Sequence, residues 1–109
     1  MNDLITQRFV DALRPLLSRH SARSAWLVGS RARGTAAPES DIDVIVVAPT
    51  DRPFADRGLD YMEALRIAGV GVDLLVYTPE EFSRMQEEER PFLSHALEGA
   101  IPIDVKGTG

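Results

Sequence analysis

The sequence contains no cysteine, so it can form neither a disulfide bond nor a thiolate metal site. Long hydrophobic runs are also missing, and no segment is apolar enough to cross a bilayer. The first ten residues carry Asp3 and Arg8 and lack the apolar stretch of a signal peptide. These absences fit a reducing compartment, and we expect a soluble, cytoplasmic protein.

Basic residues are scarce relative to acidic ones. The 12 Lys and Arg residues stand against 17 Asp and Glu residues, which gives a formal net charge of -5. Because a free-standing nucleic-acid binder usually carries a basic face, this balance argues against a nucleic-acid partner, although it allows a basic pocket. A length of 109 residues, with 44% hydrophobic and 27% charged residues, is typical of one small globular domain. We therefore expect a single domain over residues 1–109.

Apolar, β-branched runs predict the strands of a small sheet. Three main strands are expected over residues 25–28, 42–48 and 70–77. A short edge strand is expected over 101–105, because Pro102 would interrupt a central strand. Helical segments alternate with these strands. The order predicts an α/β (α+β) fold, with a sheet of three to four strands flanked by helices.

Helical patterns fill the segments around the strands. Apolar residues from Leu4 to Leu17 recur at helical spacing, and Pro15 predicts a kink or an early end. Further helices are expected over 53–69, from 79 to about 90 and over 92–98. The second of these begins with a capping signal, in which Thr78 is followed by proline and then by Glu81. The helix over 53–69 is expected to bury Leu59, Met62, Leu65 and Ile67.

Three acidic residues stand at unusual places in the strand pattern. Asp41 and Asp43 begin the second strand, where residues two apart point to the same face of a sheet. Two adjacent carboxylates repel each other, and a divalent cation such as Mg²⁺ removes that cost. Asp73 lies in an otherwise apolar third strand, a position that makes sense if it joins the other two. Three carboxylates can hold two metal ions for displacement at phosphorus, and Asp73 could also accept a proton there.

A glycine–serine turn follows the first strand directly. Gly29 lets the backbone approach a phosphate closely, and the Ser30 hydroxyl and the following N–H groups can bind phosphate oxygens. Arg31 and Arg33 lie close by in the sequence and can stabilise a polyphosphate, although solvated surface charges are an equal alternative for both. If this turn and the acids bind one ligand, the first two strands must be antiparallel and the third parallel to the second.

The motif resembles the nucleotidyltransferase signature of the DNA polymerase beta superfamily. That signature consists of Gly29-Ser30, ten intervening residues, Asp41-Ile42-Asp43 and an aspartate in a later strand. The segments Gly-Ser-Arg-Ala-Arg-Gly and Ser-Asp-Ile-Asp are similar to those of its minimal (MNT) branch, small prokaryotic proteins of about this length. The resemblance covers a catalytic core of about 25–77 and implies the nucleotidyltransferase fold.

The resemblance also implies roles for these residues. Gly29 and Ser30 would hold the triphosphate of ATP, and Arg33 matches an arginine that often contacts phosphates. Asp41 and Asp43 would bind two Mg²⁺ ions, or Mn²⁺, with Asp73 completing the triad and acting as base. Members of this branch are commonly encoded beside a helical HEPN protein. The resemblance therefore suggests an antitoxin that adenylylates a tyrosine of a HEPN toxin.

Other interpretations stay open from the sequence alone. The protein could be a nucleotide-binding antitoxin that acts by occlusion only, or a homodimeric nucleotidyltransferase for a small, antibiotic-type molecule. Asp-x-Asp and Gly-Ser are weak signals separately, and their joint spacing carries the prediction. His20 and His95 are isolated and receive no role, whereas Trp26 and Tyr77 are expected in the core. Neither the acceptor, nor the preferred base, nor the homo- or hetero-oligomeric state follows from these residues.

Overall fold

Four strands form one sheet in the computed structural model, which describes residues 3–105. Their order is β3-β2-β1-β4, with bounds Ser24–Val28 (β1), Ile42–Val47 (β2), Val72–Tyr77 (β3) and Ile101–Pro102 (β4). β1 is antiparallel to both β2 and β4, whereas β2 is parallel to β3. The predicted mixed sheet and its strand directions are confirmed, and β4 is an edge strand shorter than expected.

β2, one of the two inner strands, is apolar on both of its faces except at one position. All of its residues are buried apart from Asp43, which is half-buried. Continuous β-branched runs of this kind are typical of strands covered on both sides. Val28, the last residue of β1, and Asp73, the second residue of β3, both lie opposite Asp43 in the register. The end of β1 and the starts of β2 and β3 therefore meet at the same end of the sheet.

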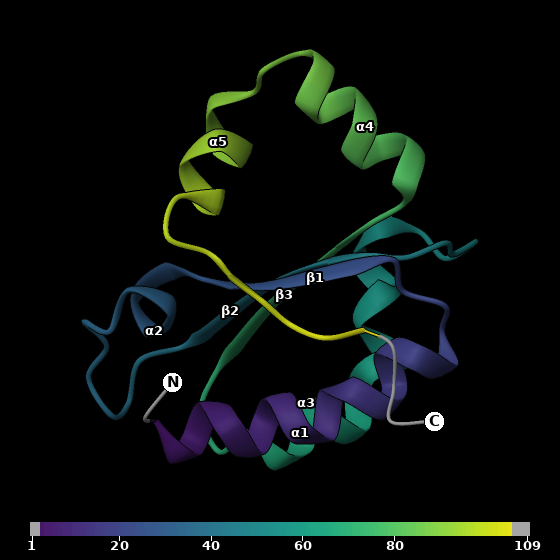
Figure 1. Cartoon of the computed structure of the whole chain (residues 1–109). Coiled ribbons are helices and arrows are strands. Elements are labelled where there is room, and N and C mark those ends of the chain that lie inside the picture. Colours follow the sequence, from purple (N-terminus) through teal and green to yellow (C-terminus); the bar gives the residue numbers. More distant parts are fainter. Residues whose placement is uncertain (1–2, 106–109) are drawn as a thin grey trace.

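One face of the sheet is covered by α1 (Leu4–Arg19) and α3 (Met62–Ile67), as Figure 1 shows. The Asp3 side chain caps α1 by accepting the N–H of Thr6 at 3.2 Å. The helix buries an apolar stripe made of Phe9, Val10, Leu13, Leu16 and Leu17. Burial of each such side chain contributes roughly 1.5–3 kcal/mol, which offsets part of the conformational entropy lost on folding.

Of the two outcomes expected at Pro15, the early end of the helix is wrong, because α1 continues to Arg19. Proline removes the hydrogen bond to the carbonyl four residues earlier, here that of Asp11. Both residues are exposed, so water can satisfy that carbonyl. The buried leucines on either side, Leu13 and Leu16, hold the helix on the sheet through the proline.

The segment after β2 differs from the single helix expected over 53–69. It forms a 3-10 helix, η1 (Phe54–Tyr61), which leads into α3. A 3-10 helix has fewer residues per turn than an α-helix, so the residues that face the core change. The expected core residues Leu59 and Ile67 are about half exposed. Their places are taken by Tyr61, Ala64 and Ala68, which are buried.

The opposite face of the sheet is covered by α4 (Pro79–Glu87) and α5 (Pro91–Leu97) (Figure 1). The predicted start of α4 is confirmed as a capping box. Thr78 Oγ1 accepts the N–H of Glu81 at 3.1 Å, and the Glu81 carboxylate accepts the N–H of Thr78 at 2.8 Å. No helix within residues 3–105 has the length and apolar character needed to cross a membrane.

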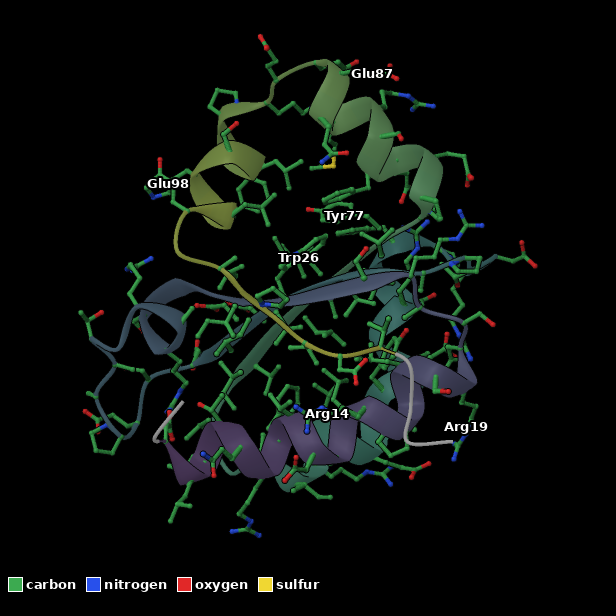
Figure 2. All side chains as sticks on the ribbon, viewed as in Figure 1. Arg14, Arg19, Trp26, Tyr77, Glu87 and Glu98 are labelled. Carbon is green, nitrogen blue, oxygen red and sulfur yellow. The ribbon has the colours of Figure 1, made fainter. Side chains whose placement is uncertain are left out.

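Aromatic side chains join this second helical layer to the sheet. Trp26 of β1 and Tyr77 of β3 point from the sheet toward α4 and α5 (Figure 2). Trp26 stacks on Phe82 of α4 with ring centroids 5.4 Å apart. Both belong to a packed cluster that includes the buried Leu93 of α5. Trp26 and Tyr77, which were expected in the core, are half-buried and pack against this cluster.

Candidate active site

Two aspartates face each other across neighbouring strands at the end of the sheet where β1 stops. Asp43 is the second residue of β2 and pairs in register with Asp73, the second residue of β3. Alternate residues of a strand share a face, so Asp43 lies on the same side as Ile45, which packs in the cluster under α4 and α5. The site therefore opens on the α4–α5 side of the sheet. Asp73 is exposed there, whereas Asp43 is half-buried.

The surroundings of Asp43 disfavour its charged form. Burial raises the pKa of Asp43 most, and the carboxylate of Asp73 raises it further, both by its charge and by a hydrogen bond between the two side chains. The charge of Asp41 acts in the same direction. Arg33 lowers the pKa of Asp43, but it does not cancel the other effects. A proton shared by the pair relieves this repulsion, and a cation placed between the carboxylates would do the same.

The third aspartate lies near this pair but does not complete a cluster with it. Asp41 directly precedes β2 and is exposed, and its carboxylate lies against the backbone of Gly71. A Cβ atom at position 71 would overlap that carboxylate, so only glycine allows this placement. Within residues 3–105, no three acidic or histidine side chains lie close enough together to hold a metal ion as they stand. The structure thus joins Asp43 with Asp73 and leaves Asp41 beside them.

The glycine–serine turn lies directly against the carboxylate pair. Gly29 has a φ of +73°, a conformation that strains other residues, and a Cβ atom there would overlap the carboxylate of Asp43. It begins α2 (Gly29–Arg33), a helix of five residues in which Ser30 is second and half-buried. Only a glycine therefore lets the backbone at the end of β1 approach the acids this closely.

The two arginines of the turn lie in different places. Arg33 is exposed, lines the same cavity as the aspartates and lowers the pKa of Asp43. Arg31 is buried and does not line that cavity. Its guanidinium donates to the Asp3 carboxylate, to the Pro38 carbonyl at 2.9 Å and to the Ser40 carbonyl at 3.1 and 2.6 Å. The structure therefore places Arg33 better than Arg31 as a candidate phosphate ligand, because the Arg31 guanidinium is engaged within the protein.

A cavity of about 420 Å³ contains the carboxylate pair. Gly29 and Arg33 form one side of it, and α5 forms the other with Phe92, His95 and Ala96. Its apolar floor comes from the sheet and consists of Val28, Val44, Ile45 and Leu75. A larger hollow of about 720 Å³ lies around the start of α1 and the loop after α2, but its one acid, Asp3, is already paired with Arg31. The smaller cavity is therefore the candidate active site.

Sequence reasoning missed the contribution of α5 to this cavity. His95 received no role from the sequence, and no pattern in it singles out Phe92. No local motif marks these residues, because they reach the cavity only through the packing of α5 on the sheet. The buried Leu93 between them is the one local sign of how the helix is oriented.

Comparison with known proteins defines the class to which this site belongs. The model of the nucleotidyltransferase domain family matches residues 8–105. This chain therefore belongs to the nucleotidyltransferase domain family, as its motif predicted. No curated protein matches its sequence.

Solved structures confirm the predicted fold. A protein assigned as a minimal nucleotidyltransferase has 27% sequence identity and a TM-score of 0.63, over 94% of this chain and 96% of that one. A crystal structure of a toxin–antitoxin with AMP-PNP contains a chain with 18% identity and a TM-score of 0.58, over 99% of this chain and 75% of that one. At 18% identity, the second likeness concerns the fold alone.

Proposed function

We propose that this nucleotidyltransferase depends on divalent cations and transfers AMP from ATP to a hydroxyl group of a partner protein. The partner would be a helical HEPN-type toxin, which the protein would neutralise as an antitoxin. The observation that carries the proposal is the facing pair of Asp43 and Asp73 directly beside the Gly29 turn. This arrangement combines two carboxylates that could hold a metal ion with a backbone turn that could approach phosphates.

The donor set at this edge fits Mg²⁺. All three acids offer carboxylate oxygens, which Mg²⁺ prefers, and Mg²⁺ commonly takes one or two protein carboxylates together with water and substrate phosphates. Asp43 and Asp73 would hold it, and Asp41, whose exposed carboxylate lies beside Gly71, would join them. The bound ion would supply charge neutralisation at the transferred phosphoryl group.

The residues of the chain itself have separable tasks in this reaction. N–H groups of the turn and the Ser30 hydroxyl bind oxygens of the triphosphate, and Arg33 stabilises its negative charge from the rim. Asp73, which is exposed at the mouth of the cavity, accepts the proton of the acceptor hydroxyl. The acceptor oxygen then forms a bond to the α-phosphorus, the bond between that phosphorus and the bridging oxygen breaks, and pyrophosphate leaves.

Two observations support a protein acceptor. The acid proposed as base, Asp73, lies at the protein surface, where a side chain of a second protein can reach it. A chain of the same fold also occurs in a solved toxin–antitoxin with AMP-PNP.

Label transfer tests the proposal. The protein is incubated with α-³²P-ATP and Mg²⁺, with and without the helical partner, and the products are separated on a denaturing gel and by thin-layer chromatography. We expect label on the partner, lost in Asp43→Asn and retained in the matched surface variant Asp51→Asn, whose residue is exposed beyond the other end of β2. Label on a small acceptor without the partner would indicate a small-molecule transferase instead. Suppression of the partner by Asp43→Asn without any label would indicate occlusion.

A further inference from the structure

Helix α5 presents an aromatic ring to the cavity that contains the carboxylate pair. Phe92 lines that cavity, and 52% of its surface is exposed. Its neighbour Leu93 is 3% exposed and anchors the helix in the cluster on the sheet. Leu93 therefore helps to hold the helix on the sheet, whereas the neighbouring Phe92 lines the cavity. Binding of a flat apolar group over this exposed ring would bury apolar surface, which is favourable.

The other surfaces near the ring narrow down what could cover it. The floor of the cavity is apolar sheet, with Val28, Ile45 and Leu75, whereas its far side has the Gly29 turn and Arg33. A ligand that spans the cavity therefore needs an anionic end and a flat apolar end. The volume of about 420 Å³ lies within the range of small-ligand sites, roughly 300–1,000 Å³.

The geometry points to Phe92 as the stacking platform for the base of the nucleoside triphosphate, with α5 as the nucleoside-binding wall. This inference rests on the proposed function, because the phosphate end is placed by the Gly29 turn. It adds a base-binding residue that no motif marks. Stacking uses the face of the base and tolerates every base, so Phe92 would bind the base without reading its edges.

The test separates the base from the phosphates. Binding of MgATP and of magnesium tripolyphosphate, which has no base, is measured by calorimetry for the wild type, Phe92→Ala, Phe92→Tyr and Phe54→Ala. Phe54 is the matched control, because it is similarly exposed at 48% but packs near Tyr77 and lines a different cavity. Since residue 92 is exposed, thermal unfolding should show all four proteins folded.

We expect Phe92→Ala to weaken MgATP binding about tenfold, the size of one lost stacking contact, and to leave tripolyphosphate binding unchanged. Phe92→Tyr should bind MgATP like the wild type, and so should Phe54→Ala. Equal weakening of both ligands, or unchanged MgATP binding in Phe92→Ala, would overturn the role of Phe92 and leave the proposed function standing. A wild-type protein that binds neither ligand would overturn the proposed function itself.

Discussion

Two buried arginines, one at each end of the sheet, are held in similar ways but restrain different parts of the molecule. The Arg31 side chain is 2% exposed and bonds the Asp3 carboxylate and the carbonyls of Pro38 and Ser40. The Arg57 side chain is 9% exposed and bonds a carboxylate, that of Glu81, and backbone carbonyls as well. Guanidinium groups suit this use because five donors in one plane can satisfy several acceptors at once.

The difference lies in what each arginine restrains. Arg31 fixes the chain up to Ser40, the residue before Asp41, and so sets where the acids of β2 begin. Arg57 ties η1 to the end of β3 through the Val76 carbonyl at 3.0 Å, far along the strand from Asp73. The same chemistry therefore positions the candidate site at one end and supports the fold at the other. Variants at the two residues should separate these roles.

Substitution of Arg31 should give the largest effect. Arg31→Met removes the donors of two carbonyls beside the site, so the loop that leads to Asp41 is free to shift. Misplacement of a reacting group by about 1 Å can lower a rate roughly 100-fold, and we expect a loss of that order in kcat with a smaller change in KM for ATP. The rate is measured per folded molecule. An unchanged rate would show that Arg31 does not position the site.

Substitution of Arg57 should affect stability instead. Arg57→Met leaves the Val76 carbonyl without its donor and Glu81 without its partner, and we expect a decrease of about 3 kcal/mol in the free energy of unfolding. Urea denaturation measures this decrease. The rate of AMP transfer per folded molecule of Arg57→Met should equal that of the wild type. A loss of transfer as large as that of Arg31→Met would remove the distinction between the two ends.

The capping box at the Arg57 end should contribute a smaller amount. Thr78→Ala removes the side-chain acceptor for the N–H of Glu81, and we expect a loss of about 1 kcal/mol, typical of an N-cap. The control is Glu98→Ala, at an exposed residue directly after α5. Thermal unfolding of the two variants gives the comparison. Equal stability of Thr78→Ala and the wild type would show that the box does not stabilise α4.

Acid should reduce the stabilisation that the contact between Arg57 and Glu81 contributes. The hydrogen bond from Arg57 lowers the pKa of Glu81 below its ordinary value of 4.5, although burial opposes this shift. The stabilisation is therefore complete above about pH 4.5 and is lost as the pH falls through the lower folded-state pKa. Wild type should be more stable than Glu81→Gln at pH 7, and the difference should shrink toward pH 3. A difference independent of pH would exclude an ionic contribution.

Local patterns account for the part of the fold that sequence predicted well. The β-branched run that forms β2 and the Thr78 capping box are defined by neighbouring residues, so both were found. Strand directions followed from one requirement, that the Gly29 turn and the acids Asp41, Asp43 and Asp73 bind one ligand. By contrast, the η1 segment was expected as an α-helix because Leu59 and Ile67 fit that spacing, and only the packing of Tyr61 shows otherwise.

The parts of the site that sequence could not give depend on distant partners. Arg31 and Arg33 look alike in the sequence, but Asp3, 28 positions from Arg31, makes one of them structural. Phe92 reaches the cavity only because Leu93 anchors α5 on the sheet. The metal role of Asp41, Asp43 and Asp73 stays a prediction, and so do the triphosphate role of Gly29 and Ser30 and the identity of the acceptor.

The most direct test of the central claim, that the Asp43–Asp73 edge binds a divalent cation together with a nucleotide, needs no acceptor. Mn²⁺ is titrated by electron paramagnetic resonance in the presence of a non-hydrolysable ATP analogue, with wild type, Asp43→Asn and Asp51→Asn. We expect protein-dependent Mn²⁺ binding in the wild type and in Asp51→Asn, and its loss in Asp43→Asn, which should remain folded because the substitution removes carboxylate repulsion. Equal binding by all three proteins would contradict the assignment of the metal site to this edge.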